Sequence, residues 1–465
     1  MVELLWTDML IFLLLATVVG FVLFARRREH LRAPWRQVGR SPIAMASLVV
    51  LVGFVSIGLL DSMHYRPSLP ASAQGQPAGY STEILSVFDG LVVHLRDMEE
   101  KTYSAPFATH LFVKETAEAT DGRVERIYPR LVHGGSHLAD PRGDRLADIV
   151  ATALRAAIAG LLLWLVLSGA FVSLWARGHG CTLADGARQI LGGHTATRWR
   201  AMLLTLGACV VLIWVVMALS VDYHVFGTDK VGEDVLYQTL KSVRTGLVIG
   251  TLTTLVMLPF AILLGIMAGY FRGWVDDFIQ YVYTTLNSIP SVLLIAAAIL
   301  ILQVYLDGHG ENITSVVERA DLRLLFLCLI LGVTSWTGLC RYLRAESLKL
   351  REVDYVQASI ALGATHFAIL GRHILPNVMH IVLITVVLDF SGLVLAEAVL
   401  SYVQIGVDPT MHSWGNMINS ARLEMAREPI VWWSLSAAFL FMFTLVLAAN
   451  LFSDAVRDAL DPRLR

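Results

Sequence analysis

The sequence predicts an all-α polytopic membrane protein with about nine transmembrane helices and one small α+β insertion on the extracytoplasmic side. Hydrophobic residues make up 56% of the 465-residue chain, and charged residues only 16%, whereas soluble proteins carry about 25% charged residues. The hydrophobic residues come in long blocks rather than in short periodic stripes. Arginines gather between alternate blocks, which is the bias that sets orientation in a membrane.

Nine blocks are long enough to span a bilayer core, which takes about 20 apolar helical residues. They lie at about 3–25, 43–60, 148–175, 201–220, 242–270, 278–304, 322–343, 378–404 and 430–453. The sixth block contains Pro290, which a membrane helix tolerates when neighbouring groups satisfy the freed carbonyl. The tryptophan pair Trp432-Trp433 at the start of the last block predicts an aromatic anchor at the membrane interface.

The positions of the arginines predict the orientation, because cytoplasmic loops retain Lys and Arg. Loop 26–40 holds six arginines, Arg26, Arg27 and Arg28 among them, against one glutamate. Loops 176–200 and 344–377 and the tail with Arg457, Arg463 and Arg465 are also basic. With nine crossings all four segments fall on one side. The amino terminus is therefore expected outside and the carboxyl terminus in the cytosol.

Residues 62–147 are expected to form the extracytoplasmic insertion. Residues 67–77 are rich in Pro, Ser, Ala and Gln and predict a linker. Short apolar runs and mixed charges follow, which indicate a small folded domain with some strands. Within it, Glu99-Glu100-Lys101 predicts a solvated face. His133 and His137 have a helical metal-ligand spacing, but Gly134-Gly135 favours a loop, so no metal site is expected.

The stretch from Asp354 to Thr365 lies between two predicted spans on the arginine-rich side. Its composition favours a short helix, on which Tyr355, Ala358 and Leu362 share one face. Gly363 permits a sharp exit, and Leu375-Pro376 marks the start of the next span, since proline suits a first helical turn. A rigid cytosolic helix with an exposed apolar face predicts docking to a partner.

This stretch resembles the cytoplasmic coupling loop of ABC importer permeases, E-A-A-x-x-x-G followed by I-x-L-P. Arg372-His373-Ile374-Leu375-Pro376-Asn377 matches the ending of the dipeptide/oligopeptide/nickel branch in full, while Gln357 and Ser359 replace the usual glutamate and second alanine. The resemblance implies contact with an ATPase subunit. The residues that it assigns to this contact are Asp354, Tyr355, Gln357, Ala358, Leu362, Gly363, Ala364 and Pro376.

A second stretch, 226–236, resembles the L-G-T-D-x-x-G-R-D-V-L elbow of the C-type permease of that branch, with Glu233 where arginine is usual. Glycines for turns and Asp234 as a helix cap predict a tight extracytoplasmic elbow. Its residues are Gly227, Thr228, Asp229, Gly232 and Asp234. The spacing also mimics a phosphate loop, but Glu233-Asp234 occupies the positions that need Lys and Ser/Thr, which excludes a nucleotide site.

Shorter matches at 269–276, 288–290, 388–390, 396–401 and 413–417 extend the resemblance over about residues 201–465. This division predicts two helices at 1–61, the insertion at 62–147, a further helix and cytosolic loop at 148–200, and a six-helix permease core at 201–465. Residues 1–200 lie outside the resemblance.

The resemblance implies a permease of the bacterial inner membrane that performs no covalent chemistry and binds no cofactor. Its expected partners are ABC ATPase subunits that hold ATP-Mg, a second, B-type permease and an extracytoplasmic solute-binding protein. The expected cargo is a peptide or a similar small polar solute, moved by alternating access. No nucleic-acid partner is expected, since the formal net charge is −2.

Acidic residues inside a membrane usually face a cavity or a partner. Asp389 and Glu397 in the eighth span, Gln404 near its outer end and Pro290 are therefore candidates for lining or gating a translocation path. The alternative for the acids is a hydrogen bond that only fixes helix packing. A rival function is an ion-gradient-driven secondary transporter or channel that uses Asp389 and Glu397, but this leaves the cytosolic docking helix unexplained.

Overall fold

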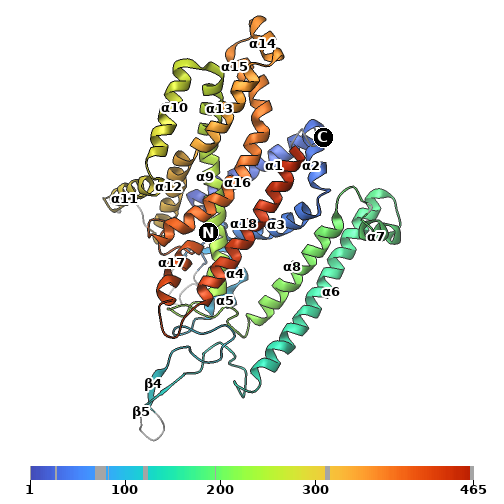
Figure 1. Ribbon diagram of the computed structural model, residues 1–465. Helices are drawn as coiled ribbons and strands as arrows, with labels where there is room; N and C mark the ends of the chain where they lie inside the picture. Colours follow the sequence, from blue (N-terminus) through green and yellow to red (C-terminus); the bar gives the residue numbers. More distant parts are fainter. Residues whose placement is uncertain are drawn as a thin grey trace. The chain divides into compact units, whose positions relative to one another are not determined.

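The computed structural model describes residues 2–26, 29–68, 80–81, 83–118, 124–193, 195–308 and 315–460. Over these ranges the chain is mostly helical, with five short strands (Figure 1). Most of the linker predicted at 67–77 lies outside the described residues, as do Arg27, Arg28, Arg463 and Arg465.

The amino-terminal half contains strands and helices in turn. Its helices are α1 (Trp6–Arg26), α2 (Glu29–Val38), α3 (Pro42–Asp61), α4 (Val87–Leu91), α5 (Val93–Asp97), α6 (Arg145–His179), α7 (Leu183–Leu191) and α8 (Trp199–Leu219). Its strands are β1 (Val2–Glu3), β2 (His64–Tyr65), β3 (Leu85–Ser86), β4 (Glu115–Glu118) and β5 (Val124–Ile127). The predicted insertion thus combines short helices and strands.

The carboxyl-terminal half contains helices and loops, with no strand among its described residues. Its elements are α9 (Val235–Phe271), α10 (Gly273–Ser288), α11 (Ser291–Gly308), α12 (Val316–Ser335), α13 (Thr337–Arg351), α14 (Asp354–Ala361), α15 (His366–Ile369), a π-helical turn (Leu370–Ile374), α16 (Leu375–Tyr402), α17 (Trp414–Glu424) and α18 (Trp433–Leu460).

Seven helical stretches among the described residues are long and apolar enough to cross a membrane. They are Pro42–Asp61, Arg145–His179, Trp199–Leu219, Val235–Phe271, Val316–Arg351, His366–Tyr402 and Trp433–Ala459. The span expected at 278–304 is not one straight helix. It is broken at Pro290 into α10 and α11, which are bent by 86° and qualify only as a pair. The described apolar part of α1, Trp6–Gly20, is shorter than a full span.

Contacts between distant segments show which loops share one side of the membrane. Strand β1 pairs antiparallel with β2, and Glu3 forms an ion pair with Arg66 at 2.8 Å. Because the candidate span α3 lies between these strands, an even number of crossings is expected from Glu3 to His64, which favours α1 as a further crossing. His412 lies 3.6 Å from Glu233, so the chain between them is expected to cross the membrane an even number of times. Three full candidate spans lie between these residues, so the bent pair α10 and α11 counts as a fourth. The described residues thus supply eight candidate spans when the bent pair is included, and the ninth expected span, at 3–25, stays a prediction.

The chain forms two compact units by contact. The first unit comprises Met1–Glu3, Trp35–Thr245 and His412–Phe452. In it, β1, β2 and β3 form a three-stranded sheet, and β4 pairs with β5 in register Glu115 to Ile127. The apolar core of this unit is built around Phe88, Leu95, Leu219, Val225 and Leu236. The insertion therefore shares its core with the helix ends that precede and follow the predicted elbow.

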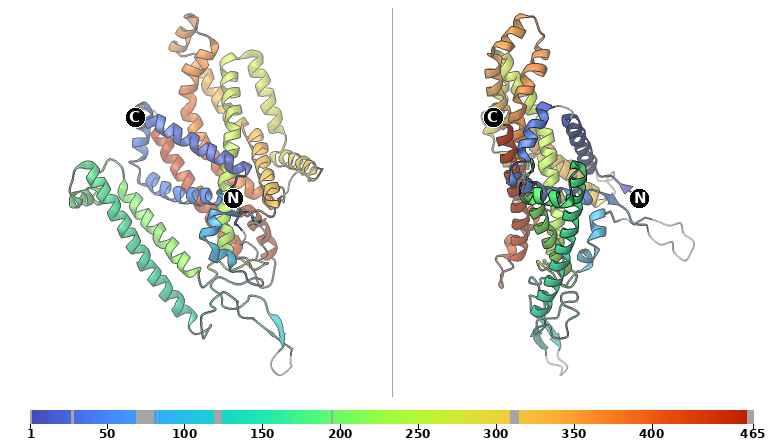
Figure 2. Two further views of the ribbon diagram at one scale, coloured as in Figure 1. Left: turned by 180° about the vertical axis from the view of Figure 1, so that it is seen from behind. Right: turned by 90° about the vertical axis from the view of Figure 1, so that its right-hand side faces the viewer.

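Helices α6 and α8 of this unit run side by side and are joined through α7 (Figures 1 and 2). Their contact is close because Gly207 of α8 has no side chain where a Cβ would lie 2.6 Å from the indole nitrogen of Trp164. That indole donates a hydrogen bond to the Leu203 carbonyl at 2.8 Å. The pair thus forms one helical hairpin whose outer faces are apolar and exposed.

The second unit comprises Leu4–Pro34, Gly246–Met411 and Ser453–Arg465. One of its cores gathers Trp336, Leu339, Leu343 and Val378 with the buried Val356 of α14. A bidentate ion pair between Arg344 and Asp276, at 2.6 and 2.7 Å, joins α13 to α10. At the start of α1, the backbone amide of Thr7 donates to the Asp321 carboxylate at 3.1 Å. The amino-terminal helix is therefore tied to α12.

Two expectations for single residues are corrected. Trp433 is not an interfacial anchor: it is 1% exposed, and its indole donates to the Thr228 carbonyl at 2.9 Å. Only its neighbour Trp432, which is 52% exposed, fits that role. Glu100 is not solvated either, because its side chain is 1% exposed. In each case a partner far away in the sequence provides the burial.

Candidate functional site

The stretch expected to dock a partner begins with α14 and ends in the first turn of α16. Gly363 ends α14 in the left-handed region, with φ of +78°, and its amide donates to the Ile360 carbonyl at 2.9 Å. Thr365 then caps α15 by accepting from the Ala368 amide at 3.4 Å. Helix α16 begins at Leu375 with Pro376 in its first turn, where the sequence predicts it. We call residues 354–376 the coupling segment.

Buried and hydrogen-bonded residues hold the coupling segment at several points. Val356, Ile369 and Ile374 are fully buried in the core of the second unit. The Tyr270 hydroxyl of α9 lies 2.8 Å from a ring nitrogen of His366, and Asn377 of α16 donates to the Tyr355 hydroxyl at 3.0 Å. The segment is thus fixed to the ends of α9 and α16.

Further contacts fix the start of the segment. The Gln357 amide donates to the Arg351 carbonyl at 2.9 Å, which closes the turn between α13 and α14. Just before it, Glu352 pairs with Arg272, the residue between α9 and α10, at 2.5 Å. The segment is therefore connected to the adjoining ends of three helices, α9, α13 and α16.

The outer surface of the segment is exposed and partly apolar. Each residue predicted to contact an ATPase is exposed: Asp354, Tyr355, Gln357, Ala358, Leu362, Gly363, Ala364 and Pro376. Leu362 is 88% exposed, Phe367 is 85% exposed and Tyr355 is 43% exposed. The sequence-based prediction did not include Phe367. The available signal was a large apolar residue in a loop expected on the cytosolic side.

The predicted elbow is a tight turn that contacts the insertion. Gly227 and Gly232 have φ of +71° and +86°, and a Cβ on Gly232 would overlap the carbonyl oxygen of Glu100. Asp234 caps α9 by accepting from the amides of Leu236 and Tyr237 at 2.8 and 3.1 Å. The Asp229 carboxylate in turn accepts from two backbone amides of the turn at 2.9 and 3.0 Å.

Thr228 joins the elbow to the insertion through its side chain. Its hydroxyl accepts from the Ser104 amide at 2.7 Å and donates to the Thr102 carbonyl at 2.9 Å. The elbow residues therefore come together in one turn, and that turn packs against the insertion, which the sequence predicts as a separate domain.

Beside the elbow lies a buried charge cluster of His224, Asp234 and Glu100, which we call the elbow clamp. His224 is hydrogen-bonded to Asp234 at 2.7 Å and lies 3.6 Å from Glu100, and its side chain is fully buried. Burial alone would lower the pKa of His224, but the bond to Asp234 and the contact with Glu100 outweigh it and raise the pKa to about 9. His224 is therefore an imidazolium at neutral pH.

Glu100 is the other end of the clamp. Burial would raise its pKa, but His224 and the backbone amides of Val132, His133 and Gly134 lower it to about 2. Those amides donate to the carboxylate at 2.8 to 3.3 Å. The carboxylate thus binds a charged ring on one side and the 132–134 loop on the other, and it fastens the insertion to the elbow.

The four candidates for a translocation path lie apart from one another in the second unit. Glu397 is 2% exposed and accepts a hydrogen bond from Ser401 of the same helix at 2.7 Å. Asp389, two turns earlier, is half-buried and makes no hydrogen bond or ion pair to the residues that the structure describes. Pro290 is exposed at the bend between α10 and α11. Glu397 thus fits a packing role better than Asp389 does.

Gln404 ends α16 in the left-handed region, with φ of +64°. Its amide donates to the Ser401 carbonyl, and the Ile405 amide donates to the Leu400 carbonyl, both at 2.9 Å. In this hydrogen-bond pattern at the end of a helix, the position of Gln404 is usually occupied by glycine. Gln404→Gly is therefore expected to raise the free energy of unfolding by about 0.5–1 kcal/mol. The thermal unfolding midpoint of the purified protein measures this.

Gln404→Ala serves as the control, because it removes the side chain and keeps the backbone strain. If Gln404 serves only as a helix end, both variants retain solute uptake and only the glycine variant melts higher. Loss of uptake in both variants would instead assign the Gln404 side chain to the path.

Comparison with known proteins is informative for the part of the chain that holds the coupling segment. The family model "Binding-protein-dependent transport system inner membrane component" matches residues 261–465. The chain is 31% identical over 244 residues to the glutathione transport system permease protein of Pectobacterium atrosepticum, covering 52% of this chain and 73% of that protein.

Two further relatives give similar values. The oligopeptide transport system permease protein of Haemophilus influenzae is 31% identical over 243 residues, which cover 52% of this chain and 71% of that protein. The dipeptide transport system permease protein of Lactococcus lactis is 30% identical over 242 residues, which cover 52% of this chain and 64% of that protein. The chain therefore belongs to the family of inner membrane components of binding-protein-dependent transport systems, as a membrane permease subunit and not an enzyme.

Proposed function

We propose that this chain is the C-type permease of an ATP-driven importer and moves peptides or similar small polar solutes inward. In this proposal, ATPase subunits that hold ATP-Mg dock on the coupling segment. A second, B-type permease completes the channel, and a solute-binding protein delivers the solute from outside. The names of the relatives, which cite glutathione, oligopeptides and dipeptides, support a cargo of peptide size.

The observation that carries the proposal is the exposure of Leu362 and Phe367 on a segment whose other side is anchored. Two large apolar side chains, 88% and 85% exposed on the polar side of a membrane protein, indicate an interaction site. Burying each against a partner is worth about 1.5–3 kcal/mol. A partner that buries both side chains would bind the segment stably.

The anchors of the segment supply the second half of the mechanism. Because His366, Gln357 and Tyr355 contact the ends of α9, α13 and α16 respectively, a displacement of the segment acts on all three helices. Closure of the ATPase subunits would thus reorient spans on both sides of the segment, which is what alternating access requires.

The remaining assignments belong to the same proposal. Asp389, Glu397, Gln404 and Pro290 are proposed to lie along or near the solute path, and the elbow is proposed to form the outer entrance. In this scheme residues 201–465 form the transport core, and residues 1–200 add three spans and the insertion. The amino terminus and the elbow face outside, and the coupling segment faces the cytosol.

Co-purification of the ATPase subunits tests the docking. Leu362→Asp and Phe367→Asp are each expected to reduce the amount of ATPase retained on the purified permease by at least about tenfold, since loss of a buried apolar anchor costs about 2 kcal/mol or more. Leu191→Asp is the control, because Leu191 is 63% exposed in a different predicted cytosolic loop. Equal retention in all three variants would contradict docking at the coupling segment.

A further inference from the structure

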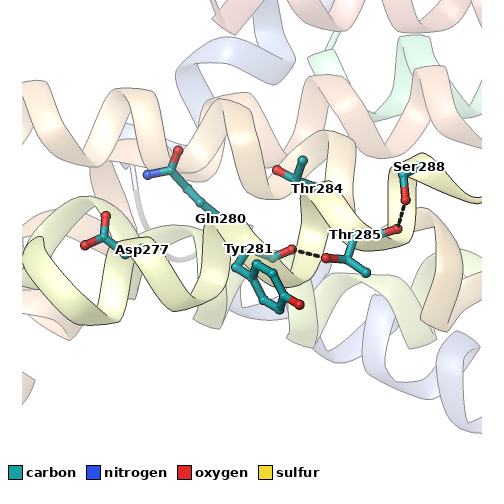
Figure 3. A pocket seen from close by; sticks show the side chains of 6 residues that line it. All are labelled: Asp277, Gln280, Tyr281, Thr284, Thr285 and Ser288. Atoms are coloured by element: carbon teal, nitrogen blue, oxygen red, sulfur yellow. Dashed lines mark hydrogen bonds between the residues drawn. The ribbon is translucent and has the colours of Figure 1, made fainter.

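A stripe of polar side chains runs along α10 on a face that the described residues of the second unit leave largely exposed. We call it the α10 stripe. It consists of Asp277, Gln280, Tyr281, Thr284, Thr285 and Ser288, which line an open groove of about 430 Å³ (Figure 3). The stripe follows successive turns of the helix and extends for about 16 Å at 1.5 Å per residue. It therefore reaches from the start of α10 to the bend at Pro290.

The other faces of α10 have different surroundings. Ile279 and Tyr283 are buried in the core of the second unit, and Asn287 accepts a hydrogen bond from Thr337 at 3.0 Å. The apolar face of the exposed surface carries Phe278, which is 62% exposed, and Trp274, which is 79% exposed. Phe278 is three residues from Tyr281 and seven from Thr285, so this apolar face borders the stripe along those two residues, while Gln280 and Thr284 lie on the side of the stripe away from Phe278.

The polar face cannot lie against lipid without a large cost. Thr285 and Ser288 satisfy their hydroxyls by donating to carbonyls of their own helix at 2.8 and 2.7 Å, so these two alone would tolerate hydrocarbon. Asp277 and Thr284 make no hydrogen bond to the residues that the structure describes. Asp277 lies one residue before the span expected at 278–304, so its carboxylate can stay at the polar side of the membrane, but an unpaired hydroxyl at Thr284 costs about 1–3 kcal/mol in lipid.

We propose that the α10 stripe is a water-filled wall of the solute path and contacts the solute during import. This inference rests on the proposed function and assigns the path to a helix face that the sequence did not indicate. The apolar face with Phe278 then faces lipid. The packed face fixes the stripe in place through the Asp276 and Arg344 ion pair.

The chemistry of the stripe restricts the solute. Hydroxyl and amide groups dominate it, and these recognise peptide groups through hydrogen bonds without demanding one side chain. Its single carboxylate, Asp277, lies at the end of α10 near the Arg272 and Glu352 ion pair, which is the coupling-segment end. A solute that carries an ammonium group is favoured there, and a polyanionic solute is repelled.

Thiol labelling of the intact transporter in proteoliposomes tests the inference. Cys328 and Cys340 are fully buried, so only Cys181 and Cys209 need replacement by alanine before new cysteines are introduced. Thr284→Cys is compared with Phe278→Cys, the matched position on the apolar face. The probe is a methanethiosulfonate that carries a quaternary ammonium group. Because only a hydrated thiolate reacts, Thr284→Cys is expected to react at least about tenfold faster.

Two outcomes would overturn the inference. Equal reaction rates at the two positions would place the stripe against lipid. Fast labelling of Thr284→Cys only when the second permease is left out would make the stripe a subunit interface. Labelling does not depend on transport. A parent complex that fails to import would therefore contradict the proposed function, while the labelling rates of Thr284→Cys and Phe278→Cys would still test the stripe.

Uptake measurements test the expected solute. Asp277→Asn is expected to reduce uptake of a lysine-containing tripeptide several-fold more than uptake of trialanine. Phe278→Leu should leave both rates at the parental level. An equal effect of Asp277→Asn on both peptides would overturn the charge preference at this end of the stripe.

Discussion

Replacing Gly363 with leucine is expected to abolish ATP-driven uptake while leaving the chain inserted in the membrane. Gly363 has φ of +78°, where a side chain costs about 1–2 kcal/mol. No atom lies within 4 Å of where its Cβ would be, so the isolated chain has room for the larger residue. The strain would instead redirect the exit from α14 and move Leu362 and Phe367, the two side chains proposed to dock the ATPase.

Gly363→Asn is the matched control, because asparagine tolerates the left-handed region better than other side chains do. We expect Gly363→Asn to retain most of the uptake and Gly363→Leu to retain almost none, with equal amounts of both in the membrane fraction. Parental uptake in the leucine variant would argue against a coupling role. Equal loss in both variants would point to crowding by the partner rather than to backbone strain.

Local sequence signals correctly predicted the elements whose geometry depends on neighbouring residues. The α16 start at Leu375 and the Asp234 cap of α9 follow from the preferences of proline and aspartate within one helical turn. The membrane spans follow from composition alone. The bend at Pro290 was indicated as an interruption, but its angle of 86° depends on how α10 and α11 pack, which a single proline does not determine.

Burial set by distant partners could not be predicted in the same way. Glu100 has the local sequence of a solvated face, yet the structure places it against His224, which is 124 positions later in the chain. Trp433 has the sequence context of an interfacial anchor, but its acceptor is the carbonyl of Thr228. Nothing near either residue in the sequence distinguishes the two environments.

The junction between the additional helices and the transport core shows the same limit. Lys241 of α9 contacts Asp61 at the end of α3 at 2.7 Å and Asp89 of α4 at 2.9 Å. These three residues come from a predicted amino-terminal span, the insertion and the predicted core. Because a largely buried lysine needs such partners, α3 and the insertion are built into the first unit rather than attached to it by a flexible linker.

The elbow clamp leads to the largest expected change in stability. Glu100→Ala leaves the His224 imidazolium buried with one carboxylate and removes the acceptor for the amides of residues 132–134. Loss of one partner from a buried charge cluster costs about 3–5 kcal/mol, so a clearly lower thermal unfolding midpoint is expected. The neighbouring Glu99 is exposed, and Glu99→Ala is expected to change stability by less than about 0.5 kcal/mol.

The pH dependence of this effect identifies its cause. His224 has a folded-state pKa of about 9, above its ordinary value of 6.5, so its contribution is complete below about pH 6.5 and is lost as the pH rises through about 9. Glu100 has a folded-state pKa of about 2, below its ordinary 4.5, so its contribution is complete above about pH 4.5 and is lost as the pH falls from there through about 2. The clamp is therefore strongest between these ranges, near pH 5 to 6.

Thermal unfolding midpoints of the parent and of Glu100→Ala, measured at pH 6 and pH 9.5, should differ less at the higher pH, where His224 is mostly neutral. Part of the difference persists there because the backbone amides still lose their acceptor. A difference of equal size at both pH values would show that Glu100 acts only through those amides, and that the imidazolium does not hold the insertion to the elbow.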